Sequence, residues 1–96
     1  NYPLPLGIRN DEYRKVLQRA LTDIKKFNPS FLVISAGFDT YINDPIGGFN
    51  ITMPFYKIIG MDIASLRLPT LIVQEGGYAI TDLGEIASNF IEGCTR

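Results

Sequence analysis

The 96-residue chain is long enough for one small domain, and its 46% hydrophobic and 20% charged residues are typical of a folded globular protein. Its net charge of −1 and its lack of a basic run argue against nucleic-acid binding, and no apolar stretch approaches the roughly 18 residues of a membrane helix. There is one cysteine, Cys94, and no histidine. These counts exclude an internal disulfide, a metal site built from imidazole and thiolate, and histidine-based catalysis within this chain. No secretion signal is evident, so we expect a cytoplasmic location.

The first predicted element is a helix over residues 10–27. Residues 1–7 carry two prolines and a glycine and should form an irregular loop. The helix then follows from apolar residues at i, i+3 and i+4 spacing, with Asn10 as its expected N-cap. The dipeptide Asn28-Pro29 should end it.

A strand is predicted over residues 31–36, because its apolar run is unbroken and typical of a strand buried on both faces. It ends in small residues and is followed by Asp39. The segment 40–50 reads as a loop, in which Asp44 precedes a proline and is explained by turn chemistry.

The rest of the chain predicts a helix, a strand and a helix. Thr52 is the expected cap of a helix that runs to about Leu66 and is apolar nearly all round, so it should be buried on more than one side. A strand over 70–74 follows, and Thr81 is the expected cap of a last helix closed by Gly93 and Arg96. The order α-β-α-β-α with a long crossover predicts an α/β fold with two parallel strands.

Three features at the strand ends are candidates for chemistry. Asp39 follows the first strand and Tyr78 follows the second, so both should lie at the carboxyl edge of the sheet, where α/β proteins bind ligands. Asp39 is either a turn or cap residue, or a metal ligand or acid/base group. Tyr78 either packs at the surface or donates a hydrogen bond to an oxyanion. Gly76 and Gly77 are a weak signal for a phosphate cradle at the start of the last helix.

Motifs along the whole chain add a family resemblance. Taken together, they resemble the C-terminal third of the zinc-dependent histone deacetylase and acetylpolyamine amidohydrolase family. Glu75 and the segment 78–84 look more like the acetylpolyamine branch. The motifs are Asn1-Tyr-Pro-Leu-Pro-Leu-Gly7, Asn10-Asp-Glu-Tyr13, Phe27-Asn-Pro29, Ser35-Ala-Gly-Phe-Asp39, Asp44-Pro45, Gly48-Phe-Asn-Ile-Thr52 and Glu75-Gly-Gly-Tyr78.

The resemblance implies a partial three-layer α/β/α fold of the arginase/deacetylase type. By that likeness Asp39 matches an aspartate ligand of the catalytic zinc, and Tyr78 matches the tyrosine that stabilises the tetrahedral oxyanion. Gly76 and Gly77 become candidate substrate-binding residues. The family's histidine pair and its Asp-x-His motif belong to an upstream part that this sequence does not contain. We therefore interpret residues 1–96 as a single partial domain, which binds zinc weakly and is inactive alone on acetylpolyamine or acetyl-lysine.

Two alternatives stay open. The chain could be a non-catalytic interaction module derived from a deacetylase, or a binder of small anions at Gly76 and Gly77. Both predicted strands lack the charges or prolines that protect a sheet edge. We therefore expect a homo-oligomer that forms through exposed strand edges.

Overall fold

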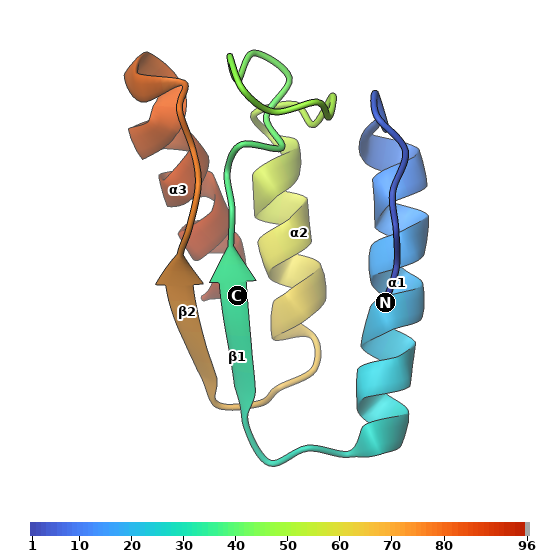
Figure 1. Cartoon of the computed structure of the whole chain (residues 1–96). Helices are drawn as coiled ribbons and strands as arrows, with labels where there is room; N and C mark the ends of the chain where they lie inside the picture. Colours follow the sequence, from blue (N-terminus) through green and yellow to red (C-terminus); the bar gives the residue numbers. More distant parts are fainter. Residues whose placement is uncertain (96) are drawn as a thin grey trace.

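The computed structural model describes residues 1–95 and contains three helices and two strands in the predicted order (Figure 1). Arg96, which was expected to close the last helix, lies outside the described residues. The elements are α1 (Asn10–Phe27), β1 (Leu32–Ala36), α2 (Phe55–Ala64), β2 (Thr70–Gln74) and α3 (Ile80–Cys94).

The start of α1 is fixed differently from what the sequence predicted, whereas its end is as predicted. Asn10 does not cap the helix, because the residue before the first turn is Arg9. Instead, Asn10 Nδ2 donates to Thr52 Oγ1 at 2.8 Å, and the Thr52 amide donates to Asn10 Oδ1 at 3.0 Å. This pair connects the start of α1 to the loop before α2. At the other end Asn28 adopts the left-handed conformation (φ 55°) and ends the helix as predicted.

The strands β1 and β2 pair in parallel, in register from Leu32 opposite Thr70 to Ala36 opposite Gln74. The α/β class and the parallel pair predicted from the sequence are therefore confirmed. The crossover between the strands contains α2, which runs antiparallel to them (Figure 1). Because both strands run the same way, their carboxyl ends lie at one edge of the sheet.

The helices α2 and α3 pack with their backbones nearly touching. A Cβ on Gly60 would lie 2.3 Å from the Phe90 carbonyl oxygen, and a Cβ on Gly93 would lie 2.1 Å from that of Lys57. Gly93 therefore serves helix packing and does not end α3. The other bounds differ modestly: α2 begins after Pro54, and the residue before α3 is Ala79 in place of the predicted cap, Thr81.

The hydrophobic core lies between one face of the sheet and the helices. The Phe38 ring packs edge-on against Tyr56 and Phe90, with ring centroids 5.9 and 5.7 Å apart. Ile51 and Ile86 are completely buried. Within residues 1–95 no helix combines the length and the apolar character needed to cross a membrane.

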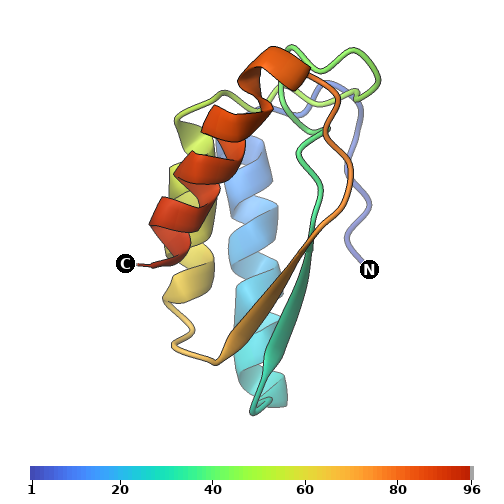
Figure 2. The ribbon, with the colours of Figure 1, turned by 90° about the vertical axis from the view of Figure 1, so that its left-hand side faces the viewer.

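The outer face of the sheet remains open. Figure 2 shows α2 and α3 on one side of the strands. On the other face, the paired residues Val33 and Leu71 are 60% and 53% exposed, and Val73 is also exposed. Residues of β1 therefore alternate between covered and exposed, and in β2 only Ile72 is partly covered, whereas the sequence predicted burial on both faces. A second layer over this face is not supplied by the part of the chain that the structure describes.

Candidate active site

The loops that follow β1 and β2 continue side by side beyond the strands. The Glu75 amide donates to the Ala36 carbonyl at 2.9 Å, and the Phe38 amide donates to the Gly76 carbonyl at 2.7 Å. The parallel pairing thus extends past the last strand residues. It brings Asp39 and Tyr78 to the same edge of the sheet, as the sequence predicted.

Asp39 and Tyr78 both lie against Gly76. A Cβ on Gly76 would be 3.0 Å from Asp39 Oδ2 and 3.3 Å from Tyr78 Cε2. A Cβ on Gly37 would be 3.0 Å from the other carboxylate oxygen, Oδ1. Two glycines therefore leave the space in which the Asp39 carboxylate lies.

The Asp39 carboxylate is half-buried and has its oxygens available. Among residues 1–95, no hydrogen bond or ion pair joins it to another side chain or amide. Its neighbour Thr40 is fixed by a 2.7 Å hydrogen bond between Thr40 Oγ1 and the hydroxyl of Tyr56. Burial raises the pKa of the Tyr56 phenol, so this group stays protonated at neutral pH. The carboxylate is thus positioned by the backbone and still free to bind a cation.

Tyr78 follows a turn that requires glycine. Gly77 has φ +152°, a region that L side chains rarely adopt, and a Cβ there would meet Leu83 Cδ1 at 2.8 Å. The Tyr78 side chain is 45% exposed. A half-exposed phenol next to a carboxylate can donate a hydrogen bond to an oxyanion bound at this edge.

Asp44 is a member of the site that the sequence did not single out. It is 9% exposed, and its Oδ1 accepts from the amides of Ile46 (2.8 Å) and Gly47 (2.9 Å), as turn chemistry predicts. Its Oδ2, however, accepts from the Tyr78 amide at 2.8 Å, 34 positions along the chain. A hydrogen-bond partner this far away in the sequence gives no local sequence pattern from which the contact could be predicted.

The pKa of Asp44 reports the same contacts. Burial raises the pKa of the carboxyl, but the N–H groups of Tyr78, Gly47, Ile46 and Ala79 together lower it further, to below its ordinary value. The carboxylate is therefore ionised at neutral pH. Because this carboxylate already accepts the Tyr78 amide, that amide is not available to an external anion, which argues against the predicted phosphate cradle at Gly76 and Gly77.

The described residues do not make up a complete metal site. Within the described chain there is no group of three or more His, Cys, Asp or Glu side chains that could hold a metal ion. Zinc usually has at least three protein ligands. Asp39 therefore fits as one ligand, and the others would have to come from beyond these residues.

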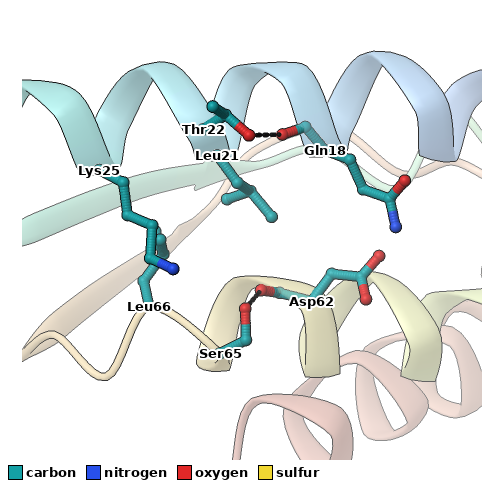
Figure 3. Close-up of a pocket in the computed structure, with 7 residues that line it drawn as sticks. All are labelled: Gln18, Leu21, Thr22, Lys25, Asp62, Ser65 and Leu66. Atoms are coloured by element: carbon teal, nitrogen blue, oxygen red, sulfur yellow. Dashed lines mark hydrogen bonds between the residues drawn. The ribbon is translucent and has the colours of Figure 1, made fainter.

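A separate cavity of about 210 Å³ lies between α1 and α2 (Figure 3). It is near the end of α2 that is opposite the carboxyl edge of the sheet (Figure 1). Several of its polar groups already have partners: Thr22 donates to the Gln18 carbonyl, Ser65 donates to the Asp62 carbonyl, and the Asp62 carboxylate is paired with Arg14. This cavity contains no constellation that suggests chemistry.

Comparison with known proteins agrees with this fold. Residues 1–94 match the Histone deacetylase domain family. The chain belongs to this family, and its α/β fragment has the arginase/deacetylase fold.

Named relatives point in the same direction. Acetylpolyamine amidohydrolase 1 of Pseudomonas aeruginosa is 44% identical over 93 residues, which cover 97% of this chain and 27% of that protein. Histone deacetylase 6 of Caenorhabditis elegans is 34% identical over 86% of this chain and 9% of its own length. The crystal structure of acetylpolyamine aminohydrolase from Burkholderia pseudomallei has a TM-score of 0.93 and 40% identity, covering 97% of this chain and 27% of that one. The chain thus spans about a quarter of the amidohydrolases that it matches.

Proposed function

We propose that the chain forms one wall of the active site of a zinc-dependent amide hydrolase that removes acetyl groups from acetylated amines. The observation that supports this most directly is the approach of Asp39 and Tyr78 to the same glycine, Gly76. A cation ligand and an oxyanion donor are thereby placed side by side. The identity to acetylpolyamine amidohydrolases favours an acetylpolyamine over acetyl-lysine as the substrate.

Each site residue has a distinct role in this proposal. Asp39 would be one ligand of zinc, which supplies Lewis-acid polarisation and a bound water of lowered pKa when present. The Tyr78 hydroxyl would donate a hydrogen bond to the oxyanion formed from the acetamide carbonyl. Gly76 and Gly77 would leave room for the acyl group beside them. Since the chain has no histidine, the proton transfers need groups from outside it, and we expect the chain to be inactive alone.

A chimera tests the proposal. Residues 1–96 would replace the matched segment of the P. aeruginosa acetylpolyamine amidohydrolase 1, and zinc content and hydrolysis of an N-acetylated diamine would be measured. We expect a zinc-loaded, active chimera. Tyr78→Phe should keep the zinc and lower kcat by about 10²–10³-fold. Asp39→Ala should lose the zinc.

Two results would refute this function. One is a folded, zinc-loaded chimera without activity, and the other is an active chimera in which Tyr78→Phe changes nothing. A Gly48→Ala chimera is a suitable control, since a Cβ at Gly48 meets only the side chain of Leu6.

A second candidate function is a homo-oligomeric interaction module. It is favoured by the exposed outer face of the sheet, where Val33 lies beside Leu71, and by the two strands, each of which has a single partner among the described residues. Such a module would need neither zinc nor the Tyr78 hydroxyl, which separates it from the first proposal. A cytoplasmic location stays a prediction from the sequence.

A further inference from the structure

Asp44 lies between the two loops that carry the candidate site. We infer that Asp44 is a positioning residue: its carboxylate fixes the Tyr78 loop to the turn that packs on Asp39, and so sets the placement of the phenol relative to the metal ligand. This inference rests on the proposed function for its purpose, while the contacts that carry it are independent of that function.

The first contact fixes the Tyr78 side of the site. Asp44 Oδ2 accepts the Tyr78 amide at 2.8 Å, and the N–H of Ala79, the next residue, helps to lower the pKa of this carboxyl. Tyr78 follows two glycines, and glycine has more backbone freedom than any other residue. An ionised acceptor on the next amide is therefore the restraint that holds the tyrosine backbone after this flexible pair.

The second contact fixes the Asp39 side. Asp44 Oδ1 accepts the Ile46 and Gly47 amides and thereby closes the turn. The closed turn lies directly on the site, because a Cβ on Gly47 would be 1.6 Å from the Asp39 carbonyl oxygen. One carboxylate therefore reaches the backbone of Asp39 through Gly47 and the backbone of Tyr78 directly.

An ordinary turn aspartate would not need this arrangement. The turn at Pro45 is satisfied by Oδ1 alone, whereas the bond from Oδ2 to Tyr78 lies outside the turn. The side chain is also buried, so a lost bond would not be replaced readily by water. Asparagine has the same shape but one acceptor oxygen, so it cannot serve the turn and the Tyr78 amide together.

The test uses the chain itself, with nuclear magnetic resonance as the readout. Amide proton shifts, amide exchange and the contact between the Tyr78 ring and the Gly76 Hα would be recorded for the wild type and for Asp44→Asn. We expect the Tyr78 amide proton to move upfield and to exchange at least ~10-fold faster in the variant, as for the loss of a bond to a charged group. The ring contact should weaken, while signals of the α2–α3 core stay unchanged.

Asp62→Asn is the matched control. Asp62 also joins two elements, by accepting from Arg14 at 2.9 and 3.0 Å, but it lies on α2 away from the site. This variant should leave the Tyr78 signals unchanged. A merely stabilising role for Asp44 would lower the unfolding free energy without moving the Tyr78 ring in the folded chain.

Three results would overturn the inference. These are an unprotected Tyr78 amide in the wild type, an unchanged Tyr78 amide and ring contact in Asp44→Asn, and an equal change in Asp62→Asn. The wild-type measurement decides even if a variant does not fold. No step needs zinc or turnover, so an inactive chimera would refute the proposed function and leave this result standing, and the reverse also holds.

Discussion

The carboxylate of Asp39 and the ring of Tyr78 lie on the same glycine, although they are carried by loops that follow different strands. A Cβ at Gly76 would be 3.0 Å from Asp39 Oδ2 and 3.3 Å from Tyr78 Cε2. Both contacts are tighter than most side chains tolerate. The two groups can therefore lie this close together because Gly76 has no side chain.

The first prediction is that Gly76→Ala impairs the site more than the fold. The methyl group must displace Asp39 or Tyr78 by a few tenths of an ångström, and overpacking of this kind costs about 1 kcal/mol. In the chimera, turnover should fall about tenfold or more, since a misplacement of 1 Å costs on the order of 10²-fold. Steady-state kinetics would check this, with Gly48→Ala as the control. Equal activity of the two variants would contradict it.

The second prediction concerns the contact between α2 and α3. Gly93→Ala would place a Cβ 2.1 Å from the Lys57 carbonyl oxygen, so the helices must separate. We expect a loss of about 1–3 kcal/mol in unfolding free energy, which outweighs the helix-propensity gain of about 1 kcal/mol.

Urea denaturation would measure this, with a control on the same helix. A Cβ on Gly84 would have nothing within 4 Å, so Gly84→Ala should stabilise the chain by about 0.5–1 kcal/mol. A Gly93→Ala variant as stable as Gly84→Ala would show that the close packing is wrong.

The third prediction is a dependence of stability on acidic pH that belongs to Asp44. Its pKa is lower in the folded state than its ordinary value of 3.8, so its contribution is complete above that value and is lost as the pH falls through the folded pKa. Asp44→Asn should lower the free energy of unfolding by about 1–3 kcal/mol at pH 7, because a buried hydrogen-bonding group is left without its partner. It should also flatten the stability curve below about pH 4. Denaturation of the wild type and of Asp44→Asn from pH 3 to pH 7 would measure this. If the two curves of unfolding free energy against pH are parallel, the prediction is wrong.

The fourth prediction is that the isolated chain neither binds zinc tightly nor hydrolyses an acetylated amine. A single carboxylate is one of the three or more ligands that zinc usually has, and general acid–base catalysis is typically worth about 10²–10⁴-fold. Calorimetric titration should detect no tight site. Nanomolar zinc binding that disappears in Asp39→Ala would be incompatible with this expectation.

The fifth prediction is that the chain self-associates through the open face or edges of its sheet. Val33 and Leu71 are paired there and more than half exposed, and burying apolar surface yields about 25 cal/mol per Å². Light scattering at micromolar concentration should give a mass above that of the monomer. The double variant Val33→Lys, Leu71→Lys should shift it to the monomer, while Leu6→Ser, at a more exposed residue in the N-terminal loop, should not. A cooperative wild-type monomer would refute this proposal.

Local patterns predicted the elements of this fold better than their caps. The apolar spacing of α1 and the two apolar runs that end in glycine predicted the order of the elements and the parallel pairing of the strands. The parallel pairing in turn predicted that Asp39 and Tyr78 lie at the same edge of the sheet. Asn10 and Thr52 were assigned as caps because each has the right side chain beside a helix. In the structure they bond to each other across 42 positions. The second oxygen of Asp44 was missed for the same reason, since its partner is set by tertiary packing.

The anchoring of α1 to the loop before α2 is uneven along the helix. Its start is tied by Asn10 to Thr52 and, just ahead of it, by the Asn50 amide to the Ile8 carbonyl at 2.8 Å. Its last residue, Phe27, is 83% exposed. Local opening of α1 should therefore begin in its final turn, so backbone amides there should exchange faster than those in its middle turns. Because the opposite end stays attached, such an opening would leave the loops around Gly76 in place.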